Sequence, residues 1–490
     1  MPFLVLVAMG VVAISRESFW IDEAFSGQLA RQPSLQAWWT VLLGNKLNDV
    51  QMPLYVGYLW LFARVFGVGE WCLRMAGLPW FICGAFFFVS AFRSRRQRFF
   101  ALCAVGLSPF GWYYLNEARP YAMQVGGALL IAAALIRLQW DETRDGCWLG
   151  CYLAGLLIVS GSSMLGMIWA APTVLAFVVM PRARLLQWAG RYRVGLILGL
   201  LAFLGLGGYY LWTMSLGARA SSAATTTWQS TGFVFYELMG LVGLGPGRLE
   251  LREARVSTFI PFLPLLAAQC ALLAVVARAA MLDLAGVGTS RVRLMAIVLG
   301  LPLLFILGAG VMLHFRVLGR HFSPLLPVYL FGVVLGCERL VRREGFWRRG
   351  AVIAFLALNL LACLSIRFSA RHAKDDYRLA ARIALEGLAR NERVWWNAAP
   401  VGAEFYNLPL TSNVFASGSA ILVENPKKPL ADSLPTPVLV LRSKPDIFDR
   451  EGLIAAYLER MGVREESRFQ AFQVLRKGQG PAAAPLPPAR

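Results

Sequence analysis

The stretch WCLRMAGLPWFICGAFFFVSAFRSRRQRFFALCAVGLSPFGWYYL, Trp71 to Leu115, contains two long apolar runs joined by the turn RSRRQR. Each run, Trp71 to Phe92 and Phe99 to Leu115, approaches the length that a helix needs to cross about 30 Å of hydrocarbon. Arginine-rich turns between such runs are typical of cytoplasmic loops. The stretch therefore predicts two membrane-spanning helices whose connecting turn, Arg93 to Arg98, faces the cytoplasm.

Most of the chain has the same character. Its 490 residues are 57% hydrophobic and only 16% charged, a composition that excludes an ordinary soluble globular protein. We predict about eleven spans, beginning with a short helix over Met1 to Ser15 rather than a cleaved signal peptide. The further predicted spans are 121–138, 147–160, 162–180, 194–216, 258–281, 294–313, 324–340 and 350–366.

The net charge of +20 is concentrated between the predicted spans. Besides Arg93 to Arg98, basic runs occur at 181–193, 291–293 and 339–349, at alternate span ends. This distribution favours the positive-inside rule over nucleic-acid binding, because no basic groove with interleaved aromatic residues accompanies the runs. It predicts a multi-pass membrane protein with a cytoplasmic N-terminus and an outward-facing segment Arg16 to Glu70.

The composition changes after Ile366, where charged residues become frequent and no later run is long enough to span. We predict a transmembrane domain over 1–366, with outside amphipathic helices near 28–66. A small periplasmic α/β domain follows over 367–477, and 478–490 form a disordered tail. In the α/β domain, helices are predicted at 377–389 and 451–461, and strands at 393–397, 437–441 and 468–475.

Ionisable residues recur at the turns that this topology places outside. Charges at membrane depth are costly and usually have a partner or a function. Carboxylates can activate a hydroxyl, arginines can hold a phosphate, and aromatic faces suit sugar rings. Simpler interpretations also stand: Arg74 could extend its charge to the membrane surface, and Glu117 with Arg119 could form an internal salt bridge. The residues concerned are Asp22, Glu23, Asp49, Arg74, Glu117, Arg119, Tyr121, Arg320 and His321.

Four motifs in the first 125 residues carry a family resemblance: WIDEA (20–24), MPLYVGYLW (52–60), FGVGEWCLR (66–74) and YLNEARPYA (114–122). Two weaker ones are LGRHFSPLLP (318–327) and DDYRLAARIA (375–384). They resemble the polyprenyl-phosphate-sugar-dependent glycosyltransferases of the GT-C fold, which include protein O-mannosyltransferases and lipid A aminoarabinose transferases. The resemblance implies a polytopic α-helical membrane protein of GT-C type, located in the bacterial inner membrane.

The resemblance also implies roles for individual residues. The family's catalytic aspartate falls on Asp22, with Glu23 beside it and Asp49 as a further acid. One departure is Gln51-Met52-Pro53, where the family usually has His-Pro-Pro. The residues implied for the donor phosphate are Arg74, Arg320, Lys46 and His321. Those implied for binding substrate or shaping the site are Glu117, Arg119, Tyr121 and Tyr55.

The implied reaction is an inverting transfer of a sugar from a polyprenyl phosphate to an acceptor hydroxyl of a protein, lipid or polysaccharide, with Asp22 as general base. We expect no cofactor and no metal, although Asp22, Glu23 and Asp49 could hold a divalent ion as in oligosaccharyltransferase-like relatives. The outer domain and the loop Gly217 to Ser257 are expected to influence acceptor choice. The alternative is a transporter or flippase of lipid-linked sugars, which should show charges at both leaflets or inverted repeats.

Overall fold

The computed structural model describes residues 2–44, 48–138, 145–179, 182–216, 226–285, 289–312, 314, 317–343 and 345–478. These residues form two compact units. We call Met1–Arg16 with Leu29–His372 the helical unit, and Glu17–Gln28 with Ala373–Arg490 the α/β unit. The segment Glu17–Gln28, which the sequence-based division counts with the transmembrane domain, clusters with the C-terminal residues.

Seven helices among the described residues are long and apolar enough to cross a membrane. They are Glu70–Ala91, Tyr121–Leu138, Asp145–Ser162, Arg193–Ser215, Ser257–Leu284, Gly319–Arg342 and Phe346–Phe368. Shorter apolar helices run over Phe3–Ala13, Pro53–Phe66, Met164–Leu175 and Leu301–Met312. The predicted polytopic helical fold is therefore confirmed, and the protein is embedded in a membrane.

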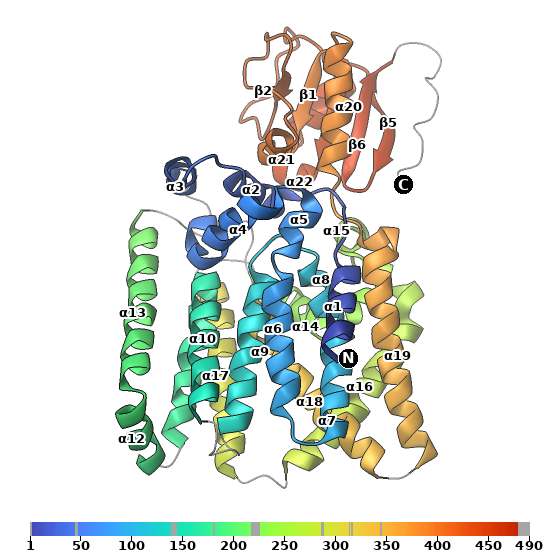
Figure 1. Ribbon diagram of the computed structural model, residues 1–490. Helices are drawn as coiled ribbons and strands as arrows, with labels where there is room; N and C mark the ends of the chain where they lie inside the picture. The colour runs from blue at the N-terminus through green and yellow to red at the C-terminus, as the bar shows by residue number, and fades with distance from the viewer. Residues whose placement is uncertain are drawn as a thin grey trace. The chain divides into compact units, whose positions relative to one another are not determined.

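The helical unit contains the following elements (Figure 1): α1 (Pro2–Ala13), α3 (Leu35–Gly44), η1 (Asn48–Gln51), α4 (Pro53–Phe66), α5 (Glu70–Met75), α6 (Leu78–Ala91), α7 (Arg95–Gly106), α8 (Pro109–Leu115), α9 (Tyr121–Leu138), α10 (Asp145–Ser162), α11 (Met164–Ala170), η2 (Ala171–Val179), α12 (Arg182–Arg191), α13 (Arg193–Ser215), α14 (Trp228–Leu238), η3 (Leu241–Gly243), α15 (Arg248–Ala254), η4 (Arg255–Phe262), α16 (Leu263–Leu284), α17 (Thr289–Met312), η5 (Gly319–Leu325), α18 (Leu326–Arg342) and α19 (Phe346–Phe368).

One predicted span, 99–115, is broken in the structure. It divides into α7 and α8 at Ser108, whose side chain accepts a hydrogen bond from the Gly111 N–H as an N-cap. Pro109 follows at the first helical position, where it lacks the N–H that a continuous helix would need. The span prediction overlooked this Ser-Pro start signal because the hydropathy is continuous across it.

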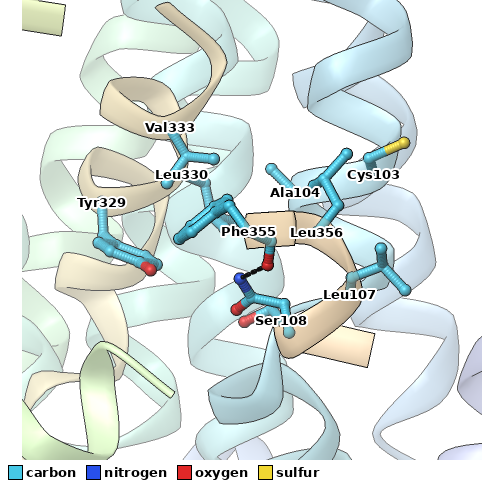
Figure 2. A pocket seen from close by; sticks show the side chains of 10 residues that line it. Cys103, Ala104, Leu107, Ser108, Tyr329, Leu330, Val333, Phe355 and Leu356 are labelled. Atoms are coloured by element: carbon cyan, nitrogen blue, oxygen red, sulfur yellow. Dashed lines mark hydrogen bonds between the residues drawn. The ribbon is translucent and has the colours of Figure 1, made fainter. Parts of the chain in front are cut away.

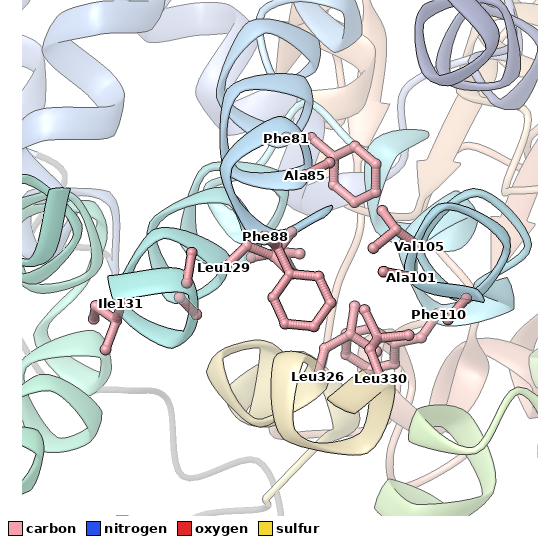
Figure 3. Close-up of a cluster of buried hydrophobic side chains, with 14 of the residues drawn as sticks. Phe81, Ala85, Phe88, Ala101, Val105, Phe110, Leu129, Ile131, Leu326 and Leu330 are labelled. Atoms are coloured by element: carbon pink, nitrogen blue, oxygen red, sulfur yellow. The ribbon is translucent and has the colours of Figure 1, made fainter. Parts of the chain in front are cut away.

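The core of the helical unit lies between α6, α8, α9 and α18. Figure 3 shows Phe88 of α6 beside Leu129 of α9 and Leu330 of α18, all of which belong to one buried hydrophobic cluster. Helices α6 and α9 approach closely through two glycines: a methyl group on Gly84 would overlap the Gly126 carbonyl, and one on Gly126 would overlap the Trp80 carbonyl. Small residues allow such backbone approach in membrane helices.

Replacing Gly84 by alanine should therefore destabilise the helical unit by about 1–3 kcal/mol, since the backbones must move apart to admit a methyl group. The measurement is the thermal unfolding midpoint of the purified protein in detergent. Gly150→Ala in α10 is the matched control, because apart from atoms of its own helix none lies within 4 Å of the added methyl group. Equal midpoints for the two variants would contradict this account of the helix contact.

Basic turns gather at one end of the helical unit. The turn between α6 and α7, helix α12 and the turn between α18 and α19 all lie at the lower end in Figure 1, whereas α4 and α5 lie at the upper end. The arginine runs and most of the predicted site residues therefore belong to opposite ends of this unit. The sequence predicts this separation, because successive spans run in opposite directions and every second turn lies at the same end.

The α/β unit is built on a six-stranded sheet of order β2-β3-β1-β4-β6-β5. Strands β2, β3, β1 and β4 are parallel, and β6 and β5 are antiparallel to their neighbours. The elements are β1 (Val394–Asn397), β2 (Leu410–Thr411), β3 (Ala420–Leu422), β4 (Leu439–Ser443), β5 (Val463–Phe469) and β6 (Phe472–Lys477), with helices α2 (Ile21–Ala30, shared with the helical unit at its end), α20 (Tyr377–Ala389), α21 (Pro400–Phe405), α22 (Pro445–Phe448) and α23 (Leu453–Arg460).

Strands β2 and β3 and most of β5 were not predicted, and the predicted strand 468–475 runs across the turn between β5 and β6. Strands β2 and β3 are two and three residues long, too short for a periodic pattern. Strand β5 lies at the edge of the sheet and reads VREESRF, with most of its residues exposed. Edge strands carry charge that discourages further pairing, and this charge hides the strand pattern. The predicted tail at 478–490 lies outside the described residues from residue 479 onward.

His372, at the end of the helical unit, gives a pH-dependent stability. Its Nε2 accepts a hydrogen bond from Arg371 Nε at 3.2 Å, and Arg371 also donates to the Gly243 carbonyl. Burial and the Arg371 charge lower the pKa of His372 to about 4. The unfolded chain binds a proton near pH 6.5, so it binds more protons than the folded chain between these values, and stability falls as the pH is lowered through them.

Lowering the pH from 7 to 4 should thus remove up to about 3 kcal/mol of stability through this group. Thermal unfolding midpoints measured across that range should fall less steeply for His372→Asn than for the wild type. Parallel curves for the two proteins would show that His372 is not the group responsible.

Candidate active site

Six residues predicted from the sequence are buried in the helical unit, on η1, α4, α5, the turn between α8 and α9, and the start of α9. Their exposed fractions are small: Asp49 6%, Tyr55 1%, Arg74 0%, Glu117 2%, Arg119 3% and Tyr121 6%. Four of them are charged. Charged groups are rarely buried without partners, because removal from water is costly.

Arg74 holds the end of α1. Its Nη1 donates to the Ser15 carbonyl at 3.2 Å and lies 3.4 Å from the Ser15 hydroxyl. The Ser15 N–H in turn donates to Asn116 Oδ1 at 2.7 Å. Ser15, two residues beyond α1, is therefore bonded both to Arg74 of α5 and to Asn116 in the turn between α8 and α9.

Asp49 and Arg119 form a buried ion pair. Arg119 Nη1 lies 2.7 Å from Asp49 Oδ1, and the two side chains are 4% and 8% exposed. Arg119 Nη2 also contacts the Met52 sulfur at 3.5 Å. This pair joins η1 to the turn that carries Glu117, so the acid of the Gln51-Met52-Pro53 region is fixed by a charge-assisted hydrogen bond.

A second charged network involves residues that the sequence analysis did not single out. Arg248 Nε donates to Glu237 Oε1 at 2.7 Å, and Arg248 Nη2 donates to the Tyr114 hydroxyl at 3.0 Å. The guanidinium carbon lies 4.1 Å from the centre of the Tyr113 ring, while Glu237 is 3% exposed. Glu237 stands alone as an acid in the apolar stretch GFVFYELMG, and that isolation was the signal available.

The motif LGRHF lies against this network. A methyl group on Gly319 would overlap the Glu237 carboxylate. The backbone of Gly319, the residue before Arg320, therefore lies directly beside that acid. His321 Nδ1 accepts from the Leu318 N–H at 3.2 Å, and the His321 carbonyl accepts from Trp169 Nε1 at 2.8 Å. A neutral His321 therefore carries its proton on Nε2.

In the α/β unit, Asp22 and Glu23 occupy the first turn of α2, where the helix dipole favours negative charge. Glu23 is completely buried and its Oε2 lies 3.2 Å from Lys374 Nζ. Asp22 is partly buried. The two neighbouring carboxylates thus have different surroundings, with Glu23 engaged by a lysine that sequence patterns gave no reason to choose.

Two predictions concern features other than these contacts: the role of Lys46 and the absence of a metal. Lys46 lies outside the described residues. Within the parts of the chain that the structure describes, no group of three or more His, Cys, Asp or Glu side chains is placed to hold a metal ion. The absence of a metal therefore stays a prediction.

A small pocket lies elsewhere in the helical unit, between α7, α18 and α19 (Figure 2). In it Asn359 donates to the Phe355 carbonyl at 2.8 Å. Its lining is Cys103, Ala104, Leu107, Ser108, Tyr329, Leu330, Val333, Phe355, Leu356 and Asn359. None of the predicted site residues belongs to this mostly apolar lining, so we do not assign the pocket to the chemistry.

No protein-family model matches the chain, and no curated protein was found to match it. Among solved structures it is similar to ArnT from Cupriavidus metallidurans in the apo state, with 13% identity, coverage of 98% of both chains and a TM-score of 0.51. The same protein bound to undecaprenyl phosphate gives 12% identity, 98% coverage of both chains and a TM-score of 0.48. An Archaeoglobus fulgidus oligosaccharyltransferase complex with zinc and sulfate gives 11% identity, 97% coverage of this chain, 73% of that chain and a TM-score of 0.48. The first likeness shows the fold, which is the predicted GT-C fold.

Proposed function

We propose that this protein is a membrane glycosyltransferase that moves a sugar from a polyprenyl-phosphate donor to an acceptor hydroxyl, with inversion at the anomeric carbon. The observation that supports it is the presence of two ion pairs with buried acids, Asp49 with Arg119 and Glu237 with Arg248, in a helical membrane unit of GT-C fold. Fold alone does not define activity, whereas ionic groups kept at membrane depth are typical of a functional site.

In this proposal Asp22 accepts the proton of the acceptor hydroxyl as its oxygen attacks the sugar. The leaving phosphate is already an anion and needs no general acid. Its charge is held by Arg320 and His321, with Lys46 as a further candidate. Arg74, which donates to Ser15, fixes the end of α1. Glu23 is paired with Lys374 and is not assigned as a base.

We propose a location in a bacterial inner membrane, and the arrangement of basic turns supports one orientation in it. The turns next to α7, α12 and α19 would face the cytoplasm under the positive-inside rule, and the ends carrying α4 and α5 would face the periplasm. We propose a cytoplasmic N-terminus and a periplasmic C-terminal domain on this basis.

The test is a transfer assay with the full-length protein in liposomes. A panel of radiolabelled undecaprenyl-phosphate sugars is supplied together with a membrane extract as acceptor. We expect label to leave the lipid for one donor, with release of undecaprenyl phosphate. Label that crosses the bilayer while it stays on the lipid would instead identify a transporter or flippase.

A further inference from the structure

The segment Glu17–Gln28 packs on residues from the far end of the chain. The Phe19 ring lies 5.1 Å from the Phe405 ring, measured between centroids. Gly27 lies so close to the same ring that an added methyl group would come within 2.6 Å of Phe405 Cε2. The segment that carries Asp22 is therefore in direct van der Waals contact with the C-terminal part of the α/β unit.

Hydrogen bonds fix the backbone just before Asp22. The Tyr406 hydroxyl accepts from the Phe19 N–H at 2.8 Å and lies 3.2 Å from the Ser18 hydroxyl oxygen. The Ser18 oxygen accepts from the Arg378 N–H, at the start of α20, at 3.0 Å. The Ser18 hydroxyl and the Phe19 N–H are thus both held by residues that follow residue 373.

The charged contact comes directly after Asp22. Glu23 is fully buried, and Lys374, whose side chain is 7% exposed, lies 3.2 Å from it. Lys374 is itself fixed through its neighbours: Asp375 pairs with Lys444 at the end of β4, and Asp376 caps α20 by accepting from the Leu379 N–H at 2.9 Å. A continuous set of contacts therefore runs from the sheet to the residue next to Asp22.

From this geometry we infer that Lys374 and Tyr406 are positioning residues for Asp22, so that the C-terminal part of the α/β unit sets the placement of the base. The inference rests on the proposed function, which gives Asp22 its role. Lys374 also compensates the Glu23 charge, which would otherwise repel the adjacent Asp22 carboxylate. A base displaced by about 1 Å can lose about 10²-fold in rate.

The test uses the full-length protein in lipid nanodiscs and two independent measurements. Hydrogen exchange of the amides in residues 17–28 reports whether the segment is held, and it needs no substrate. Transfer kinetics with the active undecaprenyl-phosphate sugar report kcat and the KM for the donor. The variants are Lys374→Met, Lys374→Arg and Tyr406→Phe. The matched control is Arg460→Met, which removes a cation from an exposed pair with Asp432.

We expect Lys374→Met to raise exchange in 17–28 by about tenfold or more and to lower kcat by about 10²-fold, with the donor KM within about twofold of the wild type. Tyr406→Phe should act in the same direction more weakly. Lys374→Arg should recover most of kcat because it keeps the charge, and Arg460→Met should change neither measurement.

Unchanged exchange in Lys374→Met would overturn the inference, and so would faster exchange with an unchanged kcat. Lys374→Met removes the cation next to the buried Glu23 carboxylate and the single variant could fail to fold. In that case the double variant Glu23→Gln with Lys374→Met tests the same inference. The double variant removes both charges, and we expect its exchange in 17–28 to stay above that of the wild type. A wild-type protein inactive with every donor would overturn the proposed function, while the exchange result decides separately whether Lys374 holds the segment.

Discussion

Replacing Asp22 by asparagine is expected to lower kcat for sugar transfer by about 10²–10⁴-fold, the usual contribution of a positioned general base. Asparagine has nearly the same shape as aspartate but cannot accept the proton of the attacking hydroxyl. The measurement is single-turnover transfer of labelled sugar from undecaprenyl phosphate by the full-length protein. Binding of undecaprenyl phosphate should stay within about threefold of the wild type, because the base is not assigned to the phosphate.

The matched control for this variant is Asp432→Asn, which neutralises an exposed carboxylate of the same unit. It should transfer sugar at the wild-type rate, which separates the loss of one base from a general loss of negative charge. Transfer that persists undiminished in Asp22→Asn would remove Asp22 from the mechanism.

Replacing Arg119 by methionine should destabilise the helical unit by about 3–5 kcal/mol, because it removes the cation that lies 2.7 Å from the buried Asp49 carboxylate. Methionine retains most of the apolar volume of arginine, so the loss reports charge rather than packing. The measurement is the unfolding midpoint in a titration with denaturing detergent, monitored by intrinsic tryptophan fluorescence.

Two further variants make that result specific. The double variant Asp49→Asn with Arg119→Met removes both charges and should recover most of the lost stability. Arg342→Met, which breaks a pair in which the arginine is 53% exposed, should cost at most about 1 kcal/mol. The buried-pair account fails if the double variant is no more stable than Arg119→Met.

The membrane fold could be predicted from the sequence because hydropathy is a local property. Every residue of a run such as 121–138 contributes to the signal, and α9 has those bounds in the structure. The helix α20 was predicted over its full length for a similar reason, since its apolar face repeats at the helical period. Local breaks were harder to foresee: the Ser-Pro start of α8 changes one hydrogen bond without changing the hydropathy.

The partners of the candidate site residues could not be predicted from local patterns. Glu23 and Lys374 are 351 positions apart, and Arg119 and Asp49 are 70 apart. Nothing in the local pattern around Lys374 distinguishes it from a solvated surface lysine. Sequence motifs therefore identified Asp22 and Glu23 as a pair, whereas the structure distinguishes them by giving Glu23 a buried cation.

The α/β unit combines an early segment of the chain with its C-terminal residues, and this has a consequence for biosynthesis. Residues 17–28 are synthesised before the rest of this unit, and the tyrosine that binds Phe19 is made 387 positions later. During translation the early segment must wait without these contacts while the membrane helices that follow it are inserted. A chain that stops after Phe346–Phe368 would contain the seven long apolar helices of the described residues but would lack the hydroxyl of Tyr406 and the ammonium of Lys374, so the contacts that hold residues 17–28 would be missing.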